Sequence, residues 1–160
     1  MAQPLQLFVL KRRLRLSGLL GILVAAMGGG CGGEDQALSR DEYVARLNAM
    51  CEDFAAREQR IGEPQSVSDL VEKGPQILDA FEDAIADEID GLEAPDEIAA
   101  EANRLAELAD EQRVVLGDLV EAAQNDDFLA VRTLASENLA LNNESNSIAR
   151  ELGAKSCAGG

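Results

Sequence analysis

Apolar residues recur at intervals of three and four residues from Ser39 to Leu152, and this spacing constrains the fold more than any other feature of the sequence. It places the apolar side chains on one face of an α-helix. No segment keeps up the apolar-polar alternation, with β-branched and aromatic residues, that strands favour. We therefore predict an all-α domain over residues 39–157, followed by a tail at 158–160.

Helix start and stop signals divide this domain into four helices. The first begins at Ser39, which forms a capping-box pattern with Glu42. The second contains Gly74-Pro75, and because proline lacks an amide proton and clashes with the preceding turn, we expect this helix to be kinked or broken there. The third ends at Asn125, and Asp126 is the expected cap of the fourth.

Each predicted helix carries one apolar face, and these four faces form the expected core. Its members are Tyr43, Leu47, Met50, Cys51, Phe54, Ile61, Val67, Leu70, Val71, Ile77, Leu78, Phe81, Ile85, Ile89, Ile98, Ala102, Leu105, Leu108, Val115, Leu119, Ala122, Phe128, Val131, Leu134, Leu141, Ile148 and Leu152. Four amphipathic helices joined by short polar connections pack most simply as an up-down-up-down four-helix bundle. Such a bundle returns the fourth helix toward the start of the first.

The first thirty residues differ in charge from the rest of the chain. They contain the basic residues Lys11, Arg12, Arg13 and Arg15 and no acidic residue, whereas all 30 acidic residues follow them. The apolar segment at 16–27 is too short for a stable membrane-spanning helix, which needs roughly 20 apolar residues. A basic segment followed by a short apolar one predicts a cleavable signal peptide over residues 1–30.

The end of this leader resembles the lipobox of bacterial lipoprotein precursors. Gly29, Gly30 and Cys31 match the small-small-Cys end of that pattern, while Gly28 stands where an aliphatic residue is usual. The resemblance implies that Cys31 carries diacylglycerol and fatty acyl groups such as palmitate, that residues 31–38 form a flexible tether, and that the protein lies on the extracytoplasmic face of the cell membrane. The alternatives are ordinary cleavage, which gives a secreted protein with a free Cys31 thiol, and no cleavage.

Two cysteines remain if Cys31 is lipidated. An exported domain can keep a disulfide, and the predicted bundle brings the C-terminal tail near the first helix, so we expect one Cys51–Cys157 bridge. Two unpaired buried thiols are the alternative. No metal site of the zinc type is expected, because two cysteines without any histidine leave its ligand set incomplete.

Residues 39–157 also resemble a group of small uncharacterised secreted lipoproteins of high-GC Gram-positive bacteria. The likeness rests on "RDEYVARLNAMC" in the first helix, "AQNDDFLAVRTLASENLALNNESNSIARELG" in the last, and the closing "LGAKSC". The group implies a helical fold and brings no activity with it.

Histidine is absent from the whole chain. This excludes Ser-His-Asp and Cys-His catalysis, and it removes the Glu-x-x-His ligands of di-iron bundles. We therefore expect no enzyme activity and no cofactor. The net charge of −16 and the 3% aromatic content also argue against nucleic acid as a partner, because phosphate binding needs a basic surface and single strands need stacking platforms.

Two clusters of polar residues are candidate sites. Asp79, Glu82, Asp83 and Asp87 can share one face of the second helix and bind a divalent cation such as calcium, or they can form a solvated outer face. The last helix is polar along part of its length, where its side chains either line a cleft or docking face or simply face water. The residues concerned are Asn138, Asn142, Asn143, Ser145 and Asn146.

These observations favour a monomeric, lipid-anchored helical protein of the cell envelope that acts by binding or scaffolding an envelope protein partner. The alternative is a carrier of a small molecule or a divalent cation, which would use a pocket in the bundle or the acidic face of the second helix. An amphipathic face that packs a core and one that receives a partner have the same periodicity, so the sequence leaves both interpretations open.

Overall fold

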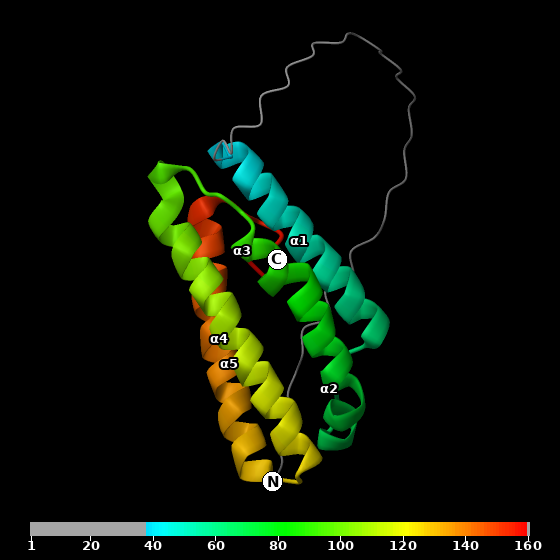
Figure 1. Ribbon diagram of the computed structural model, residues 1–160. Helices are drawn as coiled ribbons and strands as arrows, with labels where there is room; N and C mark the ends of the chain where they lie inside the picture. Colours follow the sequence, from blue (N-terminus) through cyan, green and yellow to red (C-terminus); the bar gives the residue numbers. More distant parts are fainter. Residues whose placement is uncertain (1–37, 160) are drawn as a thin grey trace, which may run out of the picture. The chain divides into compact units, whose positions relative to one another are not determined.

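Four helical stretches follow one another through residues 38–159, the part of the chain that the computed structural model describes (Figure 1). They are α1 (Arg40–Ile61), then the continuous series α2 (Val67–Phe81), η1 (Glu82–Ala86) and α3 (Asp87–Asp90), then α4 (Ala99–Gln124) after the short turn η2 (Asp96–Ile98), and finally α5 (Phe128–Leu152). Residues 38–159 contain no strand. The predicted all-α bundle of four helices is confirmed, whereas the predicted signal peptide, Cys31 and nearly all of the tether lie outside the described residues.

The helix ends follow the predicted capping chemistry, with one exception. At the start of α1, the Ser39 amide donates to a Glu42 carboxylate oxygen at 3.0 Å, and the Glu42 amide donates to the Ser39 hydroxyl. At the start of α5 the cap is Asp127, whose carboxylate accepts a hydrogen bond from the Ala130 amide at 3.0 Å. The prediction of Asp126 was wrong by one residue, because Asp126 adopts the left-handed conformation (φ 57°) that turns the chain between the two helices.

Helix α2 runs through Gly74-Pro75 without a break. A Cβ atom on Gly74 would lie 2.7 Å from Cγ2 of Val120, so the glycine lets α2 and α4 approach closely. It also removes the clash that a side chain before proline would cause. A π-helical segment, η1, follows further along the same helical stretch.

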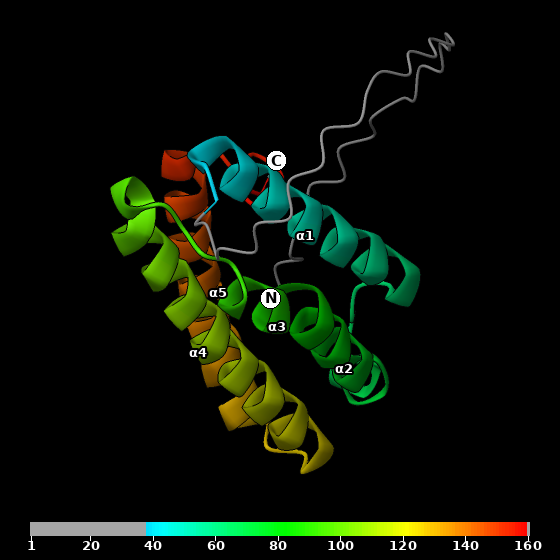
Figure 2. The same ribbon diagram turned by 45° about the horizontal axis from the view of Figure 1, so that its top comes forward.

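Helix α4 packs against both α2 and α5 (Figures 1 and 2). All seven residues predicted for the apolar face of the third helix are buried, Ile98 in η2 and the other six in α4, and Leu108 is completely enclosed. The predicted face of α5 is less deeply buried, and its first member, Phe128, is 62% exposed. Residues 38–159 belong to one compact unit with its own core. No helix in the described range is long and apolar enough to cross a membrane.

The bundle is not closed between its first and last helices. Helices α1 and α5 lie near each other where α1 begins and α5 ends, and they diverge from there (Figures 1 and 2). Their backbones come close together at few positions, although these two helices are neighbours in a regular four-helix bundle, and side chains from both helices share the core. The chain after α5 turns at Gly153, which has φ 90°, and reaches back to α1.

Candidate functional site

A cavity of about 340 Å³ occupies the space that the separation of α1 and α5 leaves open. We call it the α1–α5 groove. Its walls come from all four helical stretches and from the C-terminal tail. The lining residues are Leu47, Met50, Cys51, Phe54, Ala55, Glu58, Ile77, Phe81, Ile85, Ile89, Leu105, Ala109, Gln112, Leu116, Asn138, Asn142, Ser145, Asn146, Ala149, Ser156, Cys157 and Gly159.

One wall of the α1–α5 groove is apolar and aromatic. Phe54 of α1 and Phe81 of α2 meet edge to face, with ring centroids 5.6 Å apart and an angle of 80° between the ring planes. Ile85 and Ile89 follow on the same helical stretch, within and just after the π-helical segment. A π-helical segment changes the direction in which later side chains project, and such segments are frequent at functional sites.

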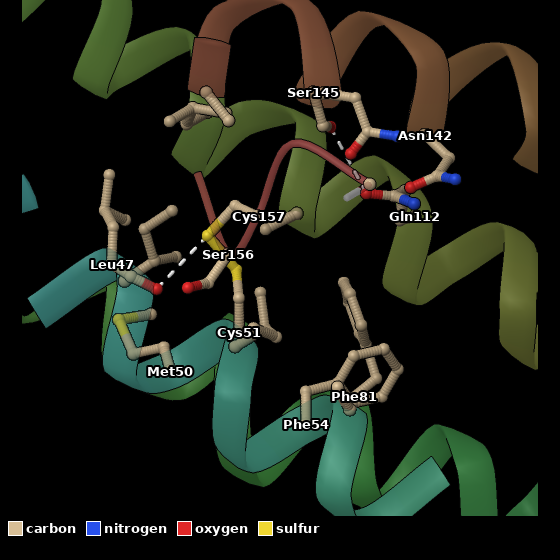
Figure 3. Close-up of a pocket in the computed structure, with 18 of the residues that line it drawn as sticks. Leu47, Met50, Cys51, Phe54, Phe81, Gln112, Asn142, Ser145, Ser156 and Cys157 are labelled. Carbon is tan, nitrogen blue, oxygen red and sulfur yellow. Dashed lines mark hydrogen bonds between the residues drawn. A yellow bond between two sulfur atoms is a disulfide. The ribbon is translucent and has the colours of Figure 1, made fainter. Parts of the chain in front are cut away.

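The opposite wall is polar and uncharged. Gln112 of α4 and Asn142 and Ser145 of α5 face the aromatic pair across the cavity (Figure 3). The Ser145 hydroxyl donates a long hydrogen bond of 3.4 Å to the Gln112 side-chain oxygen. Asn138 and Asn146 lie on the same wall, whereas Asn143 is exposed and does not line the cavity. The interpretation of these amides as the lining of a cleft therefore applies to Asn138, Asn142, Ser145 and Asn146.

Asn138 contains a buried side-chain oxygen with no hydrogen-bond partner, a situation that no other side chain in residues 38–159 shares. An unsatisfied buried acceptor of this kind costs on the order of 1–3 kcal/mol. Its side chain nevertheless belongs to the wall of the α1–α5 groove. A polar group left without a partner beside a cavity is the type of group that a ligand can satisfy.

The predicted disulfide closes one end of the groove. Cys51 and Cys157 are joined, with Cα atoms 5.2 Å apart, across 106 residues of sequence. Ser156 fixes the same tail segment to α1, because its amide donates to the Asn48 side chain and its hydroxyl to the Glu52 carboxylate, both at 2.8 Å. The Cys157 sulfur also lies 3.1 Å from the Leu47 carbonyl oxygen (Figure 3), a contact without a hydrogen bond because a disulfide sulfur has no proton.

The α1–α5 groove contains an acidic side chain and no basic one among its described lining residues. Among its described lining residues there is no lysine or arginine, and Glu58 is the one charged side chain. The pKa of Glu58 is raised by partial removal from water and, secondarily, by the neighbouring carboxylate of Glu63. The groove therefore offers amides, a hydroxyl and aromatic carbon to a ligand, and it offers nothing that would neutralise an anion.

The acidic residues of the second helix are not gathered around a single point. Asp79 and Asp83 line a separate open hollow between α1 and α2, where Arg57 binds Asp83 at 3.1 Å and Asp53 at 2.9 Å. Glu82 and Asp87 do not line this hollow. Nowhere in residues 38–159 do three or more acidic, cysteine or histidine side chains form a group that could hold a metal ion. The proposed cation set of Asp79, Glu82, Asp83 and Asp87 thus gains no support from its placement.

The apolar pattern of the sequence did not distinguish the residues of the groove wall from the rest of the core. Phe54, Phe81 and Ile85 were predicted as core, and they pack the core while also forming the apolar wall. Gln112 was not predicted as a site residue. It follows Leu108 by four residues, at a position where the apolar face of α4 would otherwise continue. Polar residues at such positions are the signal that could have located the cavity.

No family model matches the chain, and no curated protein or solved structure matches it at a significant level.

Proposed function

We propose that this protein is a lipid-anchored carrier that binds an uncharged, amphipathic small molecule in the α1–α5 groove. The observation that carries the proposal is the composition of the cavity, in which an aromatic wall faces a wall of amides and no basic residue is present. A small-molecule site is expected to be mostly apolar with a few polar groups that orient the ligand. A volume of about 340 Å³ lies at the lower end of the roughly 300–1,000 Å³ typical of such sites.

The charge distribution supports an uncharged ligand over an anionic one. An anion in the α1–α5 groove would lose its hydration without gaining a cationic partner, and it would lie near Glu58 in a protein of net charge −16. Amide and hydroxyl groups, by contrast, can replace the hydrogen bonds that an uncharged polar group makes with water. This favours fatty alcohols, amides and similar molecules as a class over free fatty acids.

Anchoring through Cys31 at the extracytoplasmic face is the second part of the proposal. It is supported by the lipobox-like end of the leader and by the Cys51–Cys157 disulfide, a bond that persists mainly outside the cytoplasm. The intact, unreduced mass of the protein from membranes of its own host tests it. A chain that starts at Cys31 with added diacylglycerol supports the anchor, and an unmodified chain would instead indicate a secreted carrier.

The binding test is carried out on the domain of residues 35–160. It uses two fluorescent probes that have the same ring system. Phenylnaphthylamine is uncharged, and anilinonaphthalene sulfonate adds one anionic group. We expect phenylnaphthylamine to bind with a one-to-one stoichiometry and at least about tenfold tighter than the sulfonate. The neighbouring variants Ala55→Trp and Ala56→Trp locate the site, because both residues are exposed on α1 but only Ala55 lines the groove.

The proposal requires that Ala55→Trp abolish binding of phenylnaphthylamine and that Ala56→Trp leave it unchanged. Circular dichroism of both variants checks that the helices remain folded. Equal binding of the two probes, or equal behaviour of the two variants, would overturn the proposal. Binding to an envelope protein, the other interpretation of the sequence, stays a prediction without a defined surface.

A further inference from the structure

Asn138 stands at a position of α5 where the apolar face would normally continue. It follows Leu134 by four residues, and Ser145 likewise follows Leu141 by four. Residues at this spacing share one face of a helix. Two polar residues thus replace apolar ones on the side of α5 that faces the bundle, and both line the α1–α5 groove.

Not all hydrogen-bond acceptors of this polar wall have a good partner. The Asn138 oxygen is buried and meets no donor, and the Gln112 oxygen receives the long 3.4 Å hydrogen bond from Ser145. Rotation about χ2 of an asparagine is broad, so the Asn138 amide can turn its oxygen toward the cavity that its side chain lines. The wall therefore has acceptor capacity that its own donors leave unused.

We propose that Asn138 determines the ligand specificity of the α1–α5 groove by accepting a hydrogen bond from the polar end of the ligand, which is an uncharged donor such as the hydroxyl of a fatty alcohol. This inference rests on the proposed carrier function. In the bound state the apolar chain lies against Phe54 and Phe81, and the hydroxyl lies against Asn138. A ligand without a donor leaves the Asn138 oxygen unsatisfied.

Three compounds with the same ten-carbon chain test the inference through displacement of phenylnaphthylamine from the domain of residues 35–160. Decanol offers an uncharged donor, decyl methyl ether offers an acceptor alone, and decanoate is anionic. We expect decanol to displace the probe at least about fivefold more effectively than the ether, a ratio in the range of one buried hydrogen bond. Decanoate is expected to be the weakest of the three.

The variant Asn138→Leu and its control Asn143→Leu then assign the preference to one residue. Both positions lie on α5, and Asn143 is exposed outside the groove. Asn138→Leu should reduce the ratio between decanol and the ether to about one, with displacement by each compound expressed relative to the variant's own affinity for phenylnaphthylamine. Asn143→Leu should keep the ratio of the unmodified domain.

The possible failures are distinguishable. If phenylnaphthylamine does not bind to the unmodified domain, the carrier function itself fails. If the probe binds and the three compounds displace it equally, or if Asn138→Leu keeps the preference for decanol, the role of Asn138 is wrong while the carrier function stands.

Discussion

At the scale of single residues, Gly74 is a point of close contact between two helices. Gly74 and Pro75 were expected to kink or break the second helix, and α2 is not broken there, while Gly74 is buried against Val120. The sequence shows which residues can end a helix, but not which ones another helix will approach closely. Gly117 of α4 provides a comparison, since a Cβ atom there would meet Leu78 at an ordinary 3.9 Å.

Alanine at these two glycines should have opposite effects on stability. Gly74→Ala gains helix propensity but forces Val120 and the α2–α4 contact apart, so we expect a net loss of about 1–2 kcal/mol in the free energy of unfolding. Gly117→Ala gains the same helix propensity, and its Cβ atom meets Leu78 at an ordinary contact distance. It should therefore stabilise the domain by about 0.5–1 kcal/mol. Urea unfolding of both variants measures the difference, and a stabilising Gly74→Ala would refute the close-approach role.

At the scale of helices, periodicity predicted the most buried elements best. Every residue predicted for the apolar face of the third helix is buried, because a long helix repeats its apolar positions over many turns, although Ala109, Val120 and Ala123 are buried in α4 as well and were not predicted. The π-helical segment η1 was not predicted. One extra residue in a single turn shifts the apolar positions too little to be distinguished from the spacing of three and four residues that an α-helix shows. The amides of α5 were identified as candidates, but their placement in a cleft depends on how far α1 lies from α5, which no single helix encodes.

The disulfide joins the tail to α1, and its loss should affect both stability and binding. Removing a bridge that closes 106 residues is expected to cost about 3–5 kcal/mol in the loop-entropy account. We expect Cys51→Ser combined with Cys157→Ser to lower the urea midpoint accordingly and to weaken binding of phenylnaphthylamine, because the tail forms one end of the groove. Dithiothreitol should reproduce the loss in the unmodified domain and leave the double variant unchanged. Unaltered stability in the double variant would show that the bridge does not hold the tail.

At the scale of the whole domain, the bundle is open on the side between α1 and α5, where the α1–α5 groove lies. Four amphipathic helices and a bridge between Cys51 and Cys157 could be predicted, and both are present. A closed ring of helices was the simplest packing of such elements, whereas the structure leaves α1 and α5 apart. Closing the bundle on this side would bury the amides of α5 against the apolar face of α1 without hydrogen-bond partners, which costs free energy.

Binding of an amphipathic molecule in the α1–α5 groove can be observed by methyl nuclear magnetic resonance of the 35–160 domain with added decanol. We expect nuclear Overhauser contacts between the decanol chain and the methyl groups of Ile77, Ile85 and Leu116, which line the groove. Val114, Leu129 and Leu139, which are exposed on α4 and α5 and do not line it, should show no such contacts. Contacts confined to these exposed residues, with none in the groove, would show that decanol binds elsewhere and that the groove is not a ligand site.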